Sequence, residues 1–464
     1  MEQQRGSSTN LDHKDLADRT IGLIAGAGNF PITMVRSLKS NGYKIVCLGV
    51  HHHADPVLAK ICDIFEYSSL ARFGRACRFF RHHNVSRAVM AGKIRKELLL
   101  QPGFIFRQLP DLYTIGTFLS FFFSPKTDFN SDSLLLASVR AFERKGIHLL
   151  PATDLAPELL LGRGKLTQKP ITLEQWEDIR CGWPLAREIG RLDIGQLVTV
   201  QDKKFLAIEG VSGTDPTTRR AVSLAKQGDI SIIKIGKPNQ DMRFDVPTIG
   251  MDTLKTMSEA GISLLALEAG RTIVIDPPEV LAQYANSHGQ TIVTLSDADR
   301  LSETCPFDAP GITPVPPPDE ALVDRTPPGA GKEIPFTCLT RRRPTANQRA
   351  DLNYGWPYVK ALERFGVGRT VLIRKRSVIE VETIEGIEAT IRRAKESRCP
   401  GALVLVNRVT EGENLTSLNA EVISAARQAK ATLLAVDETY PMDRAALIEA
   451  ANRAGIVFGT ISRD

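Results

Sequence analysis

The sequence predicts an α/β protein with three domains, of which the third repeats the second. Short apolar runs alternate with amphipathic stretches over two long blocks, 20–155 and 165–297, as strands and helices do in a largely parallel sheet. The chain has 464 residues, more than one ordinary core accommodates. The tripeptide Gly-Trp-Pro occurs twice although the chain has only 3 tryptophans, and such recurrence indicates an internal repeat.

The first block predicts a Rossmann-like domain over residues 19–160. The elements expected in it are strands at 20–26, 44–50, 87–92 and 146–151, and helices at 30–43 and 132–146. Residues 1–18 are polar and lack the apolar core of a signal peptide, so we expect a disordered tail there.

The second block predicts another α/β domain over residues 165–297. It begins with a hairpin of two apolar runs and continues with buried strands; the runs are 197–200, 205–210, 229–236, 262–270 and 290–296. Residues 298–336 hold much of the proline of the chain and show no periodic apolar face, which is typical of a linker.

The third domain, residues 337–464, is predicted to be a degenerate copy of the second. Five motifs recur in the same order, each 173 residues later. Leu166-Thr167, Gly182-Trp183-Pro184, Gly195, Gly213 and Arg219-Arg220-Ala221 return as Leu339-Thr340, Gly355-Trp356-Pro357, Gly368, Gly386 and Arg392-Arg393-Ala394. A charged stretch at 237–250 does not return, because its counterpart lacks the Lys-Pro pair and both aspartates.

Composition and charge exclude several classes of protein. The chain is 42% hydrophobic and 24% charged, as globular proteins are. Its net charge of +6 suits an anionic ligand or membrane surface. No basic run is interleaved with aromatic residues, so we expect no nucleic-acid partner. The 7 cysteines are scattered and form no CxxC pair, which favours a reducing compartment and a cytoplasmic location.

The aromatic stretch 112–124 allows two interpretations. It is shorter than the roughly 20 apolar residues that a membrane crossing needs. It could hold acyl chains or dock on a membrane surface, or it could be a buried helix.

The first expected strand ends in a glycine turn, Gly26-Ala27-Gly28-Asn29, that leads into a helix. Such glycines let backbone N–H groups approach a phosphate or sugar. Pro31 replaces the third glycine of the dinucleotide fingerprint and no acidic residue ends the second strand, so a nicotinamide dinucleotide is not expected. A nucleotide or sugar contact and a purely structural turn both stay open. The role of Lys93 has two interpretations as well, a phosphate contact or a solvated basic turn.

Thr214 and Asp215 lie in a turn bounded by Gly213 and Pro216. One interpretation is a ligand contact. The other is a structural aspartate that caps the following helix, since Asp followed by Pro is a common helix start.

The strongest local signal is the charged stretch 237–250, which follows an apolar strand. Lys237, Asp241, Arg243 and Asp245 fall within nine residues. Prolines exclude a helix here, and in an extended segment the last three side chains would share one face. Two carboxylates beside two cations suit a divalent ion held against a phosphate. A surface ion-pair cluster is the structural alternative, but a fold-determining loop should have persisted in the copy.

Together these motifs resemble the LpxI-type UDP-2,3-diacylglucosamine diphosphatases. The resemblance covers about residues 19–297 and rests on GLIAGAGNFP, MAGKIRKELLL, DSLLLASV, DIGQLVTVQ, EGVSGTD, KPNQDMRFDVPTIG and LLALEAGRTIVID. The turn GAGNFP replaces a more usual triple-glycine form, and Ser131-Asp132 replaces an acidic pair. The linker and the third domain lie beyond the pattern.

The resemblance implies a metal-dependent hydrolase of lipid A biosynthesis. Such enzymes cleave UDP-2,3-diacylglucosamine to UMP and 2,3-diacylglucosamine 1-phosphate (lipid X), with Mg²⁺ as the expected ion and water attacking the α-phosphorus. The family has two α/β domains that hold the lipid substrate between them. Its functional aspartate falls on Asp245. A location at the inner face of the inner membrane and a homo-oligomeric state are further expectations.

The expected roles of the site residues follow from the chemistry of the charged stretch and from the family resemblance. Asp245 and Asp241 are expected to hold the metal ion, and Lys237 and Arg243 to stabilise charge on the diphosphate. The expected substrate-binding residues are Gly26, Gly28, Asn29, Gly92, Lys93, Asp132, Gly213, Thr214, Asp215, Gln240, Thr248 and Gly250.

Two rival functions and the role of the copy complete the expectations. A non-catalytic UDP-sugar-binding or regulatory protein is disfavoured by the intact charged stretch. A nucleotide-sugar oxidoreductase is disfavoured by the missing ribose-binding acid. We expect the third domain to be non-catalytic, either packing on the second domain or replacing a partner subunit's copy.

Overall fold

The structure is a computed structural model that forms two compact units, each described by itself. The described residues are 19–69, 71–93, 110–123, 131–210, 213–226, 228–238, 241–243, 246–315, 327, 331–396, 401–406 and 418–462. The first unit holds those up to Leu160 together with 241–243, 246–248 and 273–276, and the second holds the rest. The expected tail at 1–18 lies outside the described residues.

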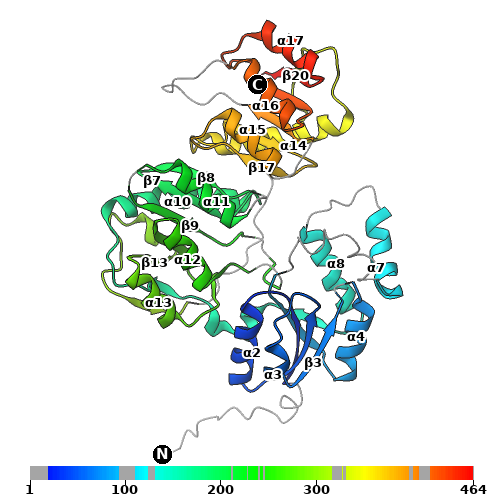
Figure 1. The fold of residues 1–464 in the computed structure, drawn as a ribbon, viewed down its shortest axis with the longest axis vertical. Coiled ribbons are helices and arrows are strands. Elements are labelled where there is room, and N and C mark those ends of the chain that lie inside the picture. Colours follow the sequence, from blue (N-terminus) through cyan, green and yellow to red (C-terminus); the bar gives the residue numbers. More distant parts are fainter. Residues whose placement is uncertain are drawn as a thin grey trace, which may run out of the picture. The chain divides into compact units, whose positions relative to one another are not determined.

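The first unit is built on a five-stranded sheet with the order β3-β2-β1-β4-β5 (Figure 1). Its strands are β1 (Thr20–Ala25), β2 (Lys44–Val50), β3 (Ile64–Ser68), β4 (Arg87–Ala91) and β5 (His148–Leu150). Its helices are α2 (Phe30–Ser40), α3 (Leu58–Ile61), α4 (Phe73–His82), α7 (Leu112–Phe123), α8 (Ser131–Glu143), α9 (Ala152–Leu155) and the short η1 (Pro157–Leu159). All neighbouring strands are parallel, which confirms the predicted α/β class.

The central strand β1 positions the predicted glycine turn. Ile21, Leu23 and Ala25 are fully buried, as in a strand covered on both faces, and pack in one core with Met34 and Leu38 of α2. The chain builds β2 and β3 on one side of β1, then β4 and β5 on the other. The strand order therefore reverses beside β1, and open α/β sheets bind ligands at such a switch point.

Two segments from much later in the sequence complete this core. Val246, Ile273 and Ile275 pack against the cluster that contains β1, and Thr33 Oγ1 donates to Ile275 O at 2.7 Å. The strands β10 (Thr248–Ile249) and β12 (Ile273–Val274) pair as a two-stranded sheet. Part of the charged stretch thus belongs to the first unit, although 165–297 appears in the sequence as one block.

The second domain contains a seven-stranded mixed sheet with the order β14-β6-β13-β11-β9-β7-β8. Its strands are β6 (Arg163–Lys165), β7 (Leu197–Gln201), β8 (Lys204–Ile208), β9 (Ile230–Lys234), β11 (Ile262–Glu268), β13 (Thr291–Leu295) and β14 (Gly311–Thr313), and its helices are α10 (Leu173–Arg191), α11 (Thr214–Leu224), α12 (Met251–Glu259), α13 (Pro278–Ser287) and η2 (Asp299–Leu301). The predicted hairpin is confirmed as the antiparallel pair β7 and β8, while β9, β11 and β13 run parallel. Strand β14 comes from the proline-rich stretch and pairs with β6 at the sheet edge.

The third domain repeats this topology in a six-stranded sheet with the order β15-β20-β19-β18-β16-β17. Its strands are β15 (Phe336–Cys338), β16 (Thr370–Ile373), β17 (Val378–Val381), β18 (Leu403–Val406), β19 (Leu433–Asp437) and β20 (Val457–Ile461), and its helices are α14 (Ala346–Glu363), α15 (Ile387–Glu396), α16 (Ala420–Gln428) and α17 (Arg444–Ala454). An antiparallel hairpin again lies beside three parallel strands. The internal repeat is confirmed.

Packing explains why Gly-Trp-Pro is retained in both copies. A Cβ on Gly182 of α10 would lie 2.7 Å from Ile233 Cδ1, and one on Gly355 of α14 would overlap Ile373 and Leu405. Each helix can approach its sheet closely only because this position has no side chain. The adjacent tryptophans, Trp183 and Trp356, are both buried in the shared core.

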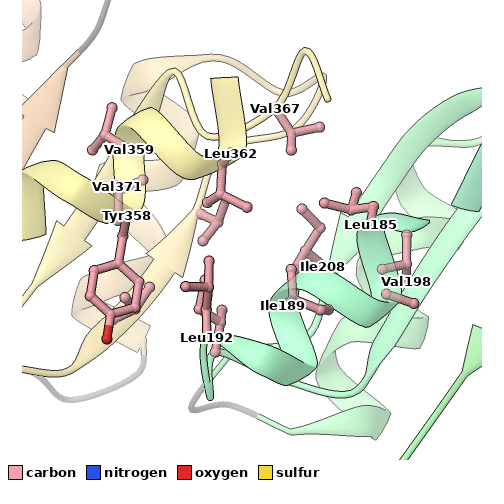
Figure 2. Packing of buried hydrophobic residues seen from close by; sticks show 14 of the residues in the cluster. Leu185, Ile189, Leu192, Val198, Ile208, Tyr358, Val359, Leu362, Val367 and Val371 are labelled. Carbon is pink, nitrogen blue, oxygen red and sulfur yellow. The ribbon is translucent and has the colours of Figure 1, made fainter. Parts of the chain in front are cut away.

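The second domain and its repeat pack against each other within the second unit. One buried apolar cluster contains residues of both, and Figure 2 shows the helices α10 and α14 contributing to it. The labelled members are Leu185, Ile189, Leu192, Val198 and Ile208 of the second domain and Tyr358, Val359, Leu362, Val367 and Val371 of the repeat.

Candidate functional site

The loops that follow β1 and β4 are hydrogen-bonded to each other. Gly26 N donates to Ala91 O at 2.8 Å, Ala27 N donates to Lys93 O at 2.8 Å, and Lys93 N donates to Ala27 O at 2.9 Å. The structure thus brings together two predicted motifs, the glycine turn and the Gly92-Lys93 pair, at the switch point of the sheet.

The glycines at this edge have two different roles. A Cβ on Gly26 would lie 2.8 Å from Lys93 O, and one on Gly92 would lie 2.8 Å from Ala27 O. These two glycines therefore allow the backbones to meet. Gly28 has φ +95° and open space where a Cβ would be, and it is exposed together with Asn29 at the start of α2. An exposed helix N-terminus of this kind suits an anionic group.

The charged stretch is divided between the two units. Asp241 and Arg243 belong to the first unit and Lys237 belongs to the second. Gln240 and Asp245 lie outside the described residues.

Asp241 and Arg243 form a closed ion pair. Arg243 Nε lies 2.9 Å from Asp241 Oδ1, Arg243 Nη2 lies 2.6 Å from Oδ2, and Arg243 N donates to Oδ1 at 3.1 Å. Arg243 Nη1 also lies 3.4 Å from Glu143 Oε1 of α8. The exclusion of a helix left an extended or a looped conformation open, and 241–243 are looped: Met242 and Arg243 form a turn that Asp241 closes by accepting from the backbone two residues on. The side chains of Asp241 and Arg243 therefore do not alternate along an extended strand.

The pairing sets the ionisation of both groups. Burial opposes ionisation of Asp241, but hydrogen bonds from the side chain and backbone of Arg243 outweigh it and lower the pKa of that carboxyl. The hydrogen bonds to Asp241 raise the pKa of Arg243. The pair is therefore fully charged at neutral pH.

Lys237 follows β9 and has its own carboxylate partner. Its Nζ lies 2.7 Å from Asp193 Oδ1, and both side chains are partly exposed. Asp193 has φ +56°, an uncommon conformation for a residue other than glycine. A side chain also holds the backbone of the loop that carries Lys237, since Arg271 Nη1 donates to Lys237 O at 3.5 Å.

A buried ionic network at the ends of β9 and β11 was missed by the sequence analysis. Glu268, the last residue of β11, accepts from Gly236 N at 2.9 Å and pairs with Arg187 at 2.8 Å and Arg271 at 3.3 Å. Arg187 also lies 2.9 Å from Asp297, which accepts from the Trp183 indole at 2.6 Å. Burial raises the pKa of Glu268, against the effect of the two arginines. The signal was available in the sequence, since Glu268 and Arg271 lie at the end of an apolar strand in the motif LLALEAGRTIVID.

The predicted Thr214 is the first residue of α11, and its side chain is tied to Glu209, which follows β8. Thr214 Oγ1 donates to Glu209 Oε1 at 2.8 Å, and the other oxygen of Glu209 accepts from Gln196 N at 3.1 Å. Gly213 has φ +86° and precedes α11. Asp215 is exposed in the first turn of α11 and is not its N-cap, so the capping explanation of this residue is wrong.

The remaining predicted residues lie at helix starts and strand ends. Asp132 is in the first turn of α8, and its side chain is outside the description. Thr248 begins β10, and Gly250 directly precedes α12 in an extended conformation.

The described residues do not by themselves form a metal site. Within them, no group of three or more His, Cys, Asp or Glu residues has the arrangement that a metal ion needs. Carboxylate oxygens are the donors that Mg²⁺ prefers, so Asp241 has the right chemistry. Both of its oxygens, however, accept hydrogen bonds from Arg243.

Comparisons with known proteins agree with this architecture. The family model of the LpxI N-terminal domain matches residues 20–159. The model of the LpxI C-terminal domain matches two stretches, 162–293 and 335–459. The UDP-2,3-diacylglucosamine pyrophosphatase LpxI of Caulobacter vibrioides is 30% identical over 273 residues, which are 57% of this chain and 93% of that protein.

These matches confirm the resemblance inferred from the motifs. The relative is covered over nearly its whole length, and the family models account for all three domains. The chain belongs to the LpxI family and carries a second copy of the C-terminal domain of that family.

Proposed function

We propose that this chain hydrolyses UDP-2,3-diacylglucosamine to UMP and 2,3-diacylglucosamine 1-phosphate as an enzyme of lipid A biosynthesis. The observation that carries the proposal is the likeness to the C. vibrioides pyrophosphatase over 93% of that protein. In the reaction, water adds to the α-phosphorus and the bond from that phosphorus to the bridging oxygen breaks. The proton released by the water passes to the departing sugar phosphate or to the solvent.

The cations of the charged stretch would bind the diphosphate by exchanging their partners. Lys237 is neutralised by Asp193, and Arg243 by Asp241 and Glu143. An incoming diphosphate carries more negative charge than any one of these carboxylates and would compete for the same donors. This preorganisation keeps both cations ordered and charged before substrate binds.

The carboxylates of the stretch would hold the divalent ion. We propose Asp245 and Asp241 as its protein ligands and Mg²⁺ as the ion, which would neutralise charge on the diphosphate. Transfer of Arg243 from Asp241 to the diphosphate would free the Asp241 oxygens for this purpose. The exposed turn at Gly28 and Asn29, with Lys93 beside it, would bind an anionic part of the substrate.

The helices α4 and α7 support a peripheral membrane contact. The start of α7 is tied to α4, because Arg75 N donates to Asp111 Oδ2 at 2.8 Å and Phe73 N donates to Thr114 Oγ1 at 3.0 Å. Leu112 is 87% exposed beside these contacts. Exposed basic residues, Arg75, Arg78 and Arg81, line α4. Within the described chain, no helix has the length and apolar character to cross a membrane.

Exposed apolar and basic groups on adjoining helices suit an anionic lipid surface, so we propose that a cytoplasmic form docks there. Co-sedimentation with vesicles that contain anionic lipid should decrease in Leu112→Asp and at high salt. Equal binding of the variant and the parent protein would contradict this docking surface.

The test of the activity is release of UMP from UDP-2,3-diacylglucosamine by the purified chain. Asp245→Ala should reduce turnover by roughly 1,000-fold or more, with an unchanged thermal transition. Asp252→Ala is the matched control, because Asp252 is an exposed aspartate in the first turn of the nearby α12. Chelation should stop the reaction and Mg²⁺ should restore it.

Two outcomes would contradict the assignment. Near-normal turnover by Asp245→Ala would remove Asp245 from the site. Binding of the substrate by the parent protein without release of UMP would favour the rival, a non-catalytic UDP-sugar-binding protein.

A further inference from the structure

The interface between the second domain and the repeat is reciprocal, because equivalent positions of the two copies meet. Gly210 faces the repeat so closely that a Cβ on it would lie 2.7 Å from Ile379 O. Thr383, the residue of the repeat that corresponds to Gly210, donates its Oγ1 to Leu206 O at 2.7 Å. Leu206 in turn corresponds to Ile379. Contacts of this kind are the mark of an isologous, two-fold interface.

Two pairs of equivalent arginines are each neutralised by one carboxylate at this interface. Arg220 and its counterpart Arg393 lie 3.3 and 3.2 Å from the same oxygen of Glu380. Arg191 and its counterpart Arg364 lie 2.8 and 3.0 Å from the two oxygens of Glu188. Glu380 is buried and the Arg220 side chain is only 11% exposed, so the first of these clusters is weakly screened by solvent.

These carboxylates favour pairing of the second domain with the repeat over pairing with a second copy of itself. The counterpart of Glu380 is Ala207, and the counterpart of Glu188 is Ala361. Two second domains meeting through this face would bring two copies of Arg220 together without the carboxylate that Glu380 supplies. Two repeats would do the same with two copies of Arg364. Loss of the Glu380 contact is costly because that cluster is largely removed from water, whereas Arg364 is 64% exposed and loses less without Glu188. Only the mixed pair has the matching carboxylate at both positions.

The part of the second domain that the repeat contacts adjoins Gly213 and Thr214, two of the predicted substrate-binding residues. Leu206 lies on β8 and Arg220 on α11, and Gly210 lies in the loop between them, where its carbonyl accepts from Gly213 N at 3.1 Å. The Arg220 Nη2 also donates to Ile208 O at 2.6 Å, which ties α11 to β8. The repeat therefore contacts the loop and both of its supports.

We propose that residues 337–464 act as a built-in partner domain that positions the predicted substrate-binding residues Gly213 and Thr214 of the second domain. The partner surface is β17 with Thr383, and its contacts with Leu206, Gly210 and Arg220 hold Gly213 and Thr214 in place. The inference rests on the proposed function only for the identity of the substrate. Thr383 and Glu380 are positioning residues, since neither lies in the loop itself.

Two threonines of the repeat provide a matched test in the full chain. Thr383 and Thr390 are both buried, and each hydroxyl lies within hydrogen-bonding distance of a backbone carbonyl and of Glu385, between which it shares its one proton. The carbonyl that Thr383 binds belongs to the second domain, whereas Thr390 binds Gly386 of the repeat. Thr383→Val removes a contact across the interface, and Thr390→Val removes a comparable contact inside the repeat.

The first readout is amide hydrogen exchange of peptides that span 206–220. Thr383→Val should accelerate exchange there by roughly tenfold. The reason is that the opening which exposes these amides no longer has to break the hydrogen bond from Thr383, so its free-energy cost is lower. Thr390→Val should leave it unchanged. Glu380→Gln is the second variant and should act in the same direction, since it removes the charge shared by Arg220 and Arg393. Unchanged exchange at 206–220 in both Thr383→Val and Glu380→Gln, with the fold intact, would overturn the proposal.

The second readout is the kinetics of UMP release. Thr383→Val should raise KM by roughly five- to tenfold with little change in kcat, as expected for a displaced binding loop. Thr390→Val should match the parent protein in both. Absence of activity in the parent protein would defeat the proposed function and leave the exchange readout valid. Accelerated exchange without any change in KM would show that the loop does not bind this substrate and would overturn the positioning role.

Discussion

The second domain and its repeat have the same strand order and the same helix-to-sheet packing, yet their carboxyl edges differ. Strand β11 ends at Glu268, which binds Arg187, Arg271 and the backbone of the loop that carries Lys237. Strand β19 ends instead at Asp437, which accepts hydrogen bonds from the backbone and the hydroxyl of Thr439 two residues on. The duplicated domain retains the glycine that its core packing needs, whereas Lys360 stands at the position of Arg187.

This difference separates two kinds of constraint. Gly182 and Gly355 cannot change without displacing a sheet, so packing preserves them in both copies. Burying Glu268 and its two arginines costs desolvation free energy that the ion pairs offset only in part. Such a network is therefore expected where it holds a functional group in position. Lys360 replaces Arg187 in the repeat, so this residue is not kept in both copies, which supports a role at the proposed site rather than in the fold.

The largest expected effect is that of substituting Glu268, at the carboxyl edge of the second domain, compared with Asp437 at the same edge of the repeat. Glu268→Gln should cost about 3–5 kcal/mol in the free energy of unfolding, because Arg187 and Arg271 would keep their charge without this partner. It should also lower kcat/KM by roughly 100-fold through displacement of the Lys237 loop. Asp437→Asn in the repeat should affect stability alone. Equal losses of activity in the two variants, measured with denaturant melts and UMP release, would contradict the distinction.

The next effect is a pH dependence confined to the repeat. Glu382 is 1% exposed, and burial raises its pKa from the ordinary 4.5 to about 7. Arg369 and Arg393 face it and oppose the rise, whereas Glu385 reinforces it. The folded chain keeps the proton up to about pH 7, while the unfolded chain releases it near pH 4.5. Unfolding between these values releases a proton, so this group makes the protein less stable as the pH rises.

Glu382→Gln removes this titration. The variant should gain up to about 3 kcal/mol relative to the parent protein at pH 8, and little at pH 4. Glu388→Gln, at a partly exposed ion pair with Arg392, is the control and should show no such pH dependence. Denaturant melts over this pH range give the comparison, and a parallel shift at all pH values would refute a buried, titrating Glu382.

The smallest effect should be the same in both copies. Thr172 and Thr345 cap α10 and α14 through identical capping boxes with Gln175 and Gln348. Thr172→Ala and Thr345→Ala should each cost about 1 kcal/mol, since each removes one N-cap hydrogen bond. Activity should be unaffected by either variant. A much larger cost in one copy would show that its helix has a constraint beyond the cap.

The sequence by itself determined the α/β class, the three domains, the repeat, the β7–β8 hairpin and the family. These depend on apolar periodicity, turn residues and motif order, which are local and are written in consecutive residues. The same reasoning failed where partners are distant in sequence. Nothing local indicates that Arg187 meets Glu268, or that the backbone at Gly26 meets Lys93.

Only the tertiary structure decided the environment of the charged stretch and the use of the repeat. Asp241 closes a turn on Arg243 rather than extending, because a local hydrogen bond and a salt bridge compete with the extended chain. Glu188 and Glu380 become interface residues only when two copies of the fold are placed face to face. The sequence does not show which charges pair, because the partners are brought together by packing, and packing also brings the repeat against Gly210 and Arg220.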